Sequence, residues 1–173
     1  YIAACFCLAL MNTSCDSFLD KQEDEALTFD KIWNTRENTE KYWRNAMSFL
    51  PDDAGDWSYA PWHAATDEAI LAWTRDSEKI NAGSWNPSNV PYYEMNHYYK
   101  GIRECNIFLQ NVDRCTDPIA TEDMKAMWKA QTHFARAYYY FMMMRIYGPV
   151  FLIGDEIMDA TASTEALARP RNT

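Results

Sequence analysis

The sequence has little glycine and no excess of basic residues, and both facts narrow the functions open to it. It contains 5 glycines in 173 residues and no glycine-rich loop, so a phosphate-cradling nucleotide site is not indicated. Its 25 Asp and Glu residues outnumber its 16 Lys and Arg residues, and the resulting formal net charge of −9 would repel a polyphosphate. We therefore expect no nucleic-acid partner.

Metal-ligating residues are also few and scattered. There is no CxxC pair, and the histidines His63, His97 and His133 are far apart in the sequence, so we expect neither a metal nor a cofactor. We expect His133, beside the apolar stripe of a long helix, to be a packing residue. Within a helix, Cys105 and Cys115 would lie about 15 Å apart, too far for a disulfide unless the chain folds back. Two free thiols are predicted.

The first eleven residues are uncharged and almost wholly apolar, but they are too few for the ~20 residues that span a bilayer. They fit the apolar region of a secretory signal and are followed by Asn12-Thr13-Ser14-Cys15. This arrangement resembles a bacterial lipoprotein signal, although Asn12 stands where an aliphatic residue is usual. We expect residues 1–15 to be such a signal, lacking its basic start, with Cys15 as the lipidation site. A buried N-terminal helix with an incidental cysteine is the alternative.

The residues that follow divide into two regions. Residues 16–34 include an acidic run, Asp20 to Glu25, and are expected to form an extended tether. Residues 35–173 are expected to form the N-terminal part of an α-helical domain whose C-terminal part is absent, because the sequence stops at Thr173 without a helix cap.

Apolar residues recur at helical spacing in three segments of this domain. The pattern predicts helices over residues 36–50, with Thr35 as N-cap, over residues 92–112, and from Thr121 to Gly148-Pro149. The last two are joined by about seven residues, which predicts an antiparallel helical hairpin. The predicted fold is mainly α.

The hairpin has the size and the alanine and aromatic packing pattern of a tetratricopeptide unit. A single unit of that kind needs further helices against it. The aromatic run Tyr138–Phe141 goes round the last helix and should be buried on several sides, while Met142–Met144 should fill gaps between helices.

Residues 51–91 form a long aromatic-rich loop region, with repeated prolines and one short helix allowed from Asp67 to Trp73. A loop region of this length is usually functional or disordered, and its aromatic content argues against disorder. Sugar rings stack their C–H faces on aromatic rings, and their hydroxyls pair with Asp, Asn and Arg side chains. The candidate platforms are Trp73, Trp85 and Tyr92, with Trp57 also considered, and the candidate hydroxyl partners are Asp67, Arg75, Asn86 and Asn89. The alternative is that most of these tryptophans pin the loops to the helices.

Two pairs of acidic residues, Asp67-Glu68 and Asp155-Glu156, raise the question of glycoside hydrolysis. Hydrolysis needs two carboxylates at a defined separation, and adjacent residues point in different directions. Serine and cysteine nucleophile motifs are absent. No catalytic residue is expected.

Five segments occur in one order along the chain: Leu19-Asp20-Lys21-Gln22, Ala65-Thr66-Asp67-Glu68-Ala69, Gly83-Ser84-Trp85-Asn86-Pro87, the stretch from Tyr98 to Leu109, and the stretch from Phe134 to Pro149. Together they resemble the SusD/RagB family, apart from Pro149, where a second glycine is common. Behind a lipoprotein-like signal, this combination is fairly specific.

The resemblance implies a surface-exposed outer-membrane lipoprotein of Bacteroidetes-type bacteria on a tetratricopeptide-like, SusD-like scaffold. Such proteins bind glycans or other nutrients and cover a SusC-like, TonB-dependent transporter. The expected function is non-catalytic capture of an oligosaccharide and its delivery to that transporter. Two alternatives stay open, namely a helical-repeat surface protein for assembly or adhesion, and an enzyme whose catalytic residues lie in the absent part.

Overall fold

The computed structural model describes residues 29–51, 64–67, 70, 76–91, 94–158, 168 and 170–172. Its elements are helices: α3 (Phe29–Ile32), α4 (Arg36–Met47), α5 (Asp76–Asn81), α6 (Met95–Asn111), the 3-10 turn η4 (Val112–Arg114) and α7 (Glu122–Tyr147). Within these residues, strand-like pairing is limited to an isolated bridge between Asn86 and Asn89. The predicted mainly α fold is confirmed.

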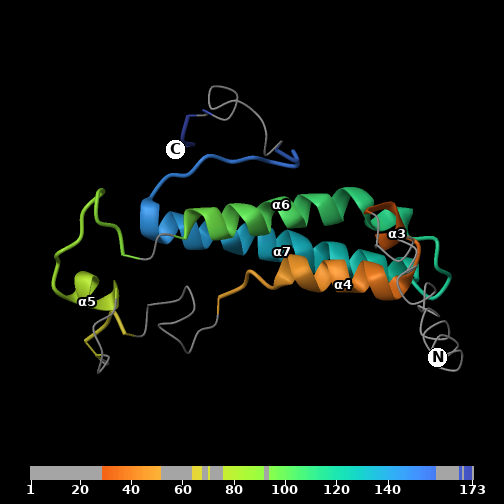
Figure 1. Cartoon of the computed structure of the whole chain (residues 1–173), viewed down its shortest axis with the longest axis horizontal. Coiled ribbons are helices and arrows are strands. Elements are labelled where there is room, and N and C mark those ends of the chain that lie inside the picture. The colour runs from red at the N-terminus through yellow and green to blue at the C-terminus, as the bar shows by residue number, and fades with distance from the viewer. Residues whose placement is uncertain are drawn as a thin grey trace, which may run out of the picture.

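Helices α4, α6 and α7 pack into a bundle, and α6 and α7 run antiparallel as the predicted hairpin (Figure 1). The predicted caps are present, because the Thr35 side chain accepts a hydrogen bond from the Asn38 N–H and the Thr121 side chain accepts one from the Met124 N–H. Gly148 ends α7 with a φ of 69°. The boundaries differ slightly from the expected ones, since α4 stops before Leu50 and α6 begins at Met95.

The apolar stripe predicted for α6 lies in the core. Of its members, Tyr98, Ile102, Cys105 and Val112 are buried, whereas Leu109 is half-buried. The α7 residues packed in the same main cluster are Ala135, Tyr139, Met142 and Met143. Cys105 and Cys115 are both buried and unpaired, as predicted, and burial raises the pKa of the Cys105 thiol to about 12.

The three helices approach one another closely at Gly101. A Cβ atom on this glycine would lie 2.9 Å from the Cβ of Phe49 and 2.9 Å from the Cε2 of Tyr139. The buried hydroxyl of Tyr139 donates a 2.6 Å hydrogen bond to the Ala46 carbonyl oxygen at the end of α4. A side chain of any size at position 101 would therefore separate the helices.

The end of the expected tether belongs to the fold. Residues 16–34 were predicted to form an extended tether, but residues 29–32 form helix α3, and Trp33 directly after it lies in the core with 1% of its surface exposed. The Trp33 ring packs 5.1 Å from the Tyr42 ring and 6.2 Å from the Phe108 ring. Burial of this large apolar ring decides the local conformation, while the acidic run that suggested a tether lies earlier, at residues 20–25. Residues 1–28, including Cys15, lie outside the described residues.

The outer side of α7 is more exposed than the sequence predicted. Tyr139 is buried and its neighbours Tyr138 and Tyr140 are half-buried, but Phe141 is 50% exposed. Phe141 belongs to an exposed row on this helix, here named the outer stripe, which comprises Met127, Phe134, Phe141 and Met144. The described helices that pack on α7 cover its other side, which buries Met142 and Met143 as expected.

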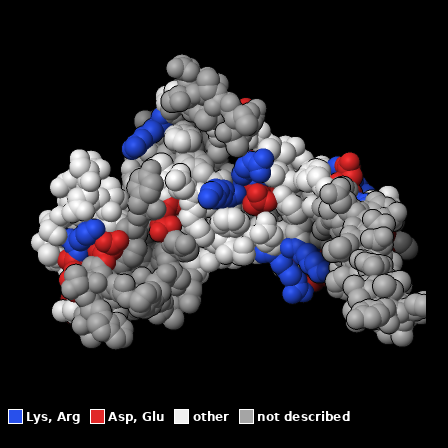
Figure 2. Space-filling view, viewed as in Figure 1, with Lys and Arg blue, Asp and Glu red and all other residues white. Residues whose placement is uncertain are grey.

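Charge is distributed in small groups of both signs. Figure 2 shows basic and acidic side chains beside one another, separated by uncharged surface. Many are ion pairs within a helix, such as Lys41–Glu37 at 2.6 Å and Arg44–Glu40 at 2.6 Å on α4. No helix in the described part of the chain is both long and apolar enough to cross a membrane.

Candidate functional site

The loop after α5 begins at a glycine that reverses the chain. The Gly83 N–H donates to the Ile80 carbonyl oxygen at 3.1 Å, and the Ser84 N–H donates to the Lys79 carbonyl oxygen at 3.0 Å. These two bonds form a Schellman motif, which requires a residue at positive φ, and Gly83 has a φ of 62°. The motif ends α5 and turns the chain so that Trp85 follows at once.

A tight turn comes directly after Trp85. The Asn89 N–H donates to the Asn86 carbonyl oxygen at 2.9 Å, and the Asn86 N–H donates back to the Asn89 carbonyl oxygen at 3.4 Å. Pro87 occupies the second position of the turn, where its fixed φ is favourable. The Asn86 Oδ1 also accepts from the Ser88 and Asn89 N–H groups at 2.9 and 3.1 Å. The turn is therefore held by its own backbone and by one asparagine side chain.

This loop presents Trp85 to solvent. The residue is 48% exposed, and residues 81–89 are exposed throughout. Together with α5, the loop lies beyond the end of the three-helix bundle (Figure 1). An exposed indole on a backbone fixed by hydrogen bonds is an aromatic platform with an N–H donor at its edge.

The structure modifies the roles expected for the two asparagines. Asn86 uses its side-chain oxygen within the turn, and the Asn89 amide lies 3.5 Å from the Ser84 carbonyl oxygen. Both side chains therefore shape the loop that carries Trp85. The turn chemistry could have been anticipated from the sequence Asn-Pro-Ser-Asn.

Asp67 lies in a short described segment at the same end of the molecule. The Asn81 side chain donates a 2.9 Å hydrogen bond to the Ala64 carbonyl oxygen, which ties residues 64–67 to α5. Asp67 is exposed and non-helical. The rest of the short helix expected from Asp67 to Trp73 lies mostly outside the described residues, as do the candidates Trp57, Trp73, Arg75 and Tyr92. Helix α5 itself was not predicted.

A titratable carboxyl that the sequence analysis missed lies at the start of α6. The Glu94 N–H donates to the Tyr147 hydroxyl oxygen at 2.8 Å, and burial raises the pKa of the Glu94 carboxyl to about 7. Burial also lowers the pKa of the neighbouring His97, whose Nε2 lies 3.2 Å from the Phe49 carbonyl oxygen. The position of Glu94 in the sequence does not indicate a raised pKa, because the shift depends on how the chain packs over the end of the helix.

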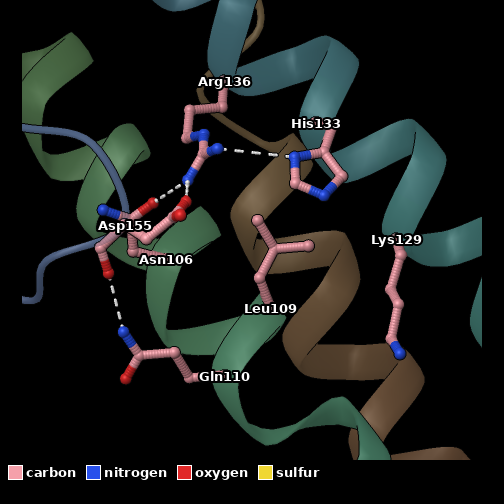
Figure 3. Close-up of a pocket in the computed structure, with 7 residues that line it drawn as sticks. All are labelled: Asn106, Leu109, Gln110, Lys129, His133, Arg136 and Asp155. Carbon is pink, nitrogen blue, oxygen red and sulfur yellow. Dashed lines mark hydrogen bonds and ion pairs between the residues drawn. The ribbon is translucent and has the colours of Figure 1, made fainter. Parts of the chain in front are cut away.

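A second polar region is a pocket of about 320 Å³ between α6, α7 and the segment that follows α7 (Figure 3). At its back, the Arg136 Nη1 lies 2.6 Å from the Asn106 Oδ1 and 2.6 Å from the Asp155 Oδ1. Asn106, 1% exposed, donates to the carbonyl oxygens of Gly154 at 3.0 Å and Glu156 at 2.7 Å. Hydrogen bonding and charge from the Arg136 guanidinium hold the pKa of the Asp155 carboxyl below its usual range.

His133 lies at the rim of this pocket and does not have the packing role that the sequence predicted. This residue is exposed rather than packed in the core, and its Nδ1 lies 3.4 Å from the Arg136 Nη2. Lys129, His133 and Arg136 share one face of α7, at spacings of four and three residues, and this face differs from the buried one. The polar spacing is visible in the sequence, but the neighbouring apolar stripe led to the prediction that His133 packs in the core.

Neither the region around Glu94 and His97 nor the pocket between α6 and α7 resembles a catalytic or metal centre. Across the described ranges, no three His, Cys, Asp or Glu side chains come close enough to hold a metal ion. The groups that carry charge are used largely in ion pairs and in hydrogen bonds that hold the fold. The described structure is thus that of a helical protein with an exposed indole on a loop and a polar pocket between two helices.

A known family matches this chain. The SusD-like family, described as starch-binding and associating with the outer membrane, matches residues 17–173. The chain belongs to this family, as the resemblance in the sequence predicted. No curated protein and no solved structure matches it.

Membership gives the protein a general function, namely starch or glycan binding in association with the outer membrane. Proteins of this family are binding proteins and generally non-catalytic. The helical fold agrees with the family, while the tetratricopeptide-like arrangement remains a prediction.

Proposed function

We propose that this protein captures an oligosaccharide at the cell surface and delivers it, chemically unaltered, to a SusC-like, TonB-dependent outer-membrane transporter. The observation that carries the proposal is Trp85, exposed on a loop that hydrogen bonds hold in one conformation. Because the backbone beneath the ring is already fixed, stacking a sugar face on it orders little more of the loop. The family's description supports starch or a related glycan as the ligand.

The rest of the binding site is proposed from the same end of the molecule. Asp67 offers a carboxylate to sugar hydroxyls, and Asn86 and Asn89 hold the platform and present their remaining polar atoms beside it. The further contacts proposed are Trp73, Arg75 and Tyr92. Apolar rings with a few polar groups around them are the general design of small-molecule sites.

Two acidic groups near the candidate regions, Glu94 and Asp155, have shifted pKa values, and a second carboxylate causes neither shift. A glycosidase needs a protonated acid beside a second carboxylate. Asp155 has a lowered pKa because Arg136 pairs with it, so it is ionised at neutral pH. Glu94 has the raised pKa of a general acid, but burial causes that shift and no described carboxylate contributes to it. These features support a protein that leaves its ligand intact.

We further propose that Cys15 carries the lipid anchor and that residues 16–28 separate the folded part from the membrane. Stable anchoring takes more than one acyl chain, as bacterial lipoprotein processing provides. In cells making the full-length protein, Cys15→Ala should move it from the outer-membrane fraction to the soluble fraction. A variant that stays with the membrane would refute the anchor.

A glycan array tests the binding function. The wild-type chain should bind a defined α-glucan or related polysaccharide, and Trp85→Ala should weaken that binding by about tenfold or more, because fully covering a large apolar side chain contributes about 1.5–3 kcal/mol. The matched control is Ile119→Ala, which alters an exposed apolar side chain between α6 and α7, at the other end of the hairpin. Release of reducing ends from the bound glycan would instead establish an enzyme.

One observation favours the alternative of a helical-repeat assembly or adhesion protein. The outer stripe of α7 exposes large apolar side chains at helical spacing, which is how helices present a surface to a protein partner. Further helices are expected to pack against this hairpin. The outer stripe is an exposed surface against which they would pack. If the array shows no glycan binding while a surface protein copurifies and is lost in Phe134→Ser, the alternative is supported.

A further inference from the structure

The pocket between α6 and α7 has more hydrogen-bonding capacity than the fold uses. The Lys129 ammonium lies 2.6 and 2.7 Å from the two carboxylate oxygens of Asp113, and an ammonium group has three N–H donors. Both side chains of this pair are partly exposed, so water and ions screen it. Gln110 donates through its Nε2 to the Asp155 carbonyl oxygen at 2.7 Å, which leaves the acceptor oxygen of the same amide for another partner.

The contact between Arg136 and His133 determines which nitrogen of the neutral imidazole donates a hydrogen bond. A guanidinium group only donates hydrogen bonds, so the His133 Nδ1 at 3.4 Å acts as the acceptor when the ring is neutral. The proton of the neutral ring then sits on Nε2. In Figure 3 this nitrogen lies on the side of the ring away from Arg136, which places a donor at the rim of the pocket.

The walls of the pocket differ in chemistry. Figure 3 shows Leu109 between the α7 side chains and the side formed by Gln110 and Asp155. The α7 wall presents N–H donors and cationic groups, whereas Gln110 and the largely exposed Asp155 side chain present acceptor oxygens. Leu109 supplies an apolar floor. A volume of about 320 Å³ lies at the small end of ligand pockets.

We infer that this pocket binds a small sugar acid, a polyol of one sugar unit that carries a carboxylate. The carboxylate lies against the Lys129 ammonium and the His133 Nε2–H, which give charge-assisted hydrogen bonds. The hydroxyls on the opposite side of the ligand reach Gln110 and Asp155, and a C–H face rests on Leu109. Asp155 does not repel the ligand strongly, because Arg136 neutralises it at 2.6 Å.

A titration of the full chain with sodium D-glucuronate, followed by amide NMR, tests this inference. D-Glucose at the same concentration tests the need for the carboxylate, and sodium acetate tests the need for the sugar. Glucuronate should shift the amide signals of Gln110, Lys129 and His133 and bind about tenfold or more tightly than either control, the effect of one charge-assisted hydrogen bond. Equal responses to glucuronate, glucose and acetate would overturn the inference.

Variants separate the pocket from nonspecific charge effects. Lys129→Gln should weaken glucuronate binding about tenfold, and loss of its exposed ion pair should cost little stability. Lys41→Gln is the matched control, because it removes another exposed ion pair, on α4 and outside the pocket. Gln110→Ala provides a second, uncharged test and should also weaken binding. If Lys129→Gln and Gln110→Ala both bind glucuronate as Lys41→Gln and the wild type do, the assignment is wrong.

This pocket is distinct from the loop that carries Trp85, so the two proposals fail separately. Trp85→Ala should leave glucuronate binding unchanged, and Lys129→Gln should leave polysaccharide binding unchanged. Loss of glucuronate binding in Trp85→Ala would place the sugar acid at the loop instead and overturn the pocket assignment.

Discussion

The three-helix bundle and the loop after α5 use their aromatic side chains in opposite ways. In the bundle, Tyr98, Phe108 and Tyr139 are fully buried, and the Tyr139 hydroxyl is hydrogen-bonded to a backbone carbonyl oxygen. In the loop, Trp85 is exposed while the backbone that carries it is held by turns on both sides. Stability and the proposed recognition of a glycan therefore depend on different residues, so each can be altered without the other.

The asparagines of the two regions, unlike the aromatic side chains, act in the same way. Asn106 in α6 is buried and holds the chain after α7, whereas Asn86 is exposed and holds the turn after Trp85. Both side chains serve the backbone, although the sequence suggested that Asn86 would contact a ligand. The polar candidates in the described residues, Asp67, Asn86 and Asn89, are all exposed.

The largest expected effect comes from the core of the bundle. Phe108→Ala should lower the free energy of unfolding by about 3–5 kcal/mol, because it leaves a cavity between α3, α4 and α6. Phe134→Ala, on the outer stripe and 67% exposed, should change it by less than about 0.5 kcal/mol. Denaturant unfolding of the two variants measures this contrast. A comparable loss in Phe134→Ala would show that another element covers the outer stripe.

A smaller effect is expected where the helices come closest. Gly101→Ala should destabilise the chain by about 1–2 kcal/mol, because overpacking costs about 1–3 kcal/mol and the better helix propensity of alanine returns up to about 1 kcal/mol. The new Cβ would meet the Phe49 Cβ, which is fixed close to its backbone, and the buried ring of Tyr139. Thermal unfolding measures the change. A stabilised variant would mean that α4 and α6 separate easily, and that this contact is not tight.

These residues also show what the sequence could predict. The helix caps Thr35 and Thr121 and the stripe from Tyr98 to Val112 are local signals, and they placed three helices and their hairpin correctly. Trp33 was misplaced because its burial depends on residues far along the chain, at Phe108 and Trp128. The Arg136–Asp155 pair was missed for the same reason, since the segment after α7 has no periodic pattern that would locate it. The sequence predicts that Trp85 lies in an exposed turn, but it does not identify a ligand for Trp85.

The junction between the two regions should respond to pH. Burial raises the pKa of Glu94 to about 7, so the folded chain holds this proton more tightly than the unfolded chain, whose carboxyl has an ordinary pKa of about 4.5. The contribution of Glu94 to stability should therefore fall as the pH rises from about 4.5 through 7. Glu94→Gln should remove that decline and raise the stability at pH 8 relative to the wild type, while leaving stability at pH 4 nearly unchanged. Parallel pH profiles of the two proteins would show that Glu94 is solvated in the folded state.

The smallest effect on stability is expected at the proposed recognition site. Trp85→Ala should change the free energy of unfolding by less than about 0.5 kcal/mol, because the ring is exposed and the turns beside it are made by other residues. The measurement decides between the two roles considered for the loop tryptophans, since a ring that pins the loop to the helices would cost about 3 kcal/mol or more when removed. A loss of that size would assign Trp85 to packing and move the binding platform to another aromatic residue. An unchanged stability together with weakened glycan binding is the combination that a dedicated platform requires.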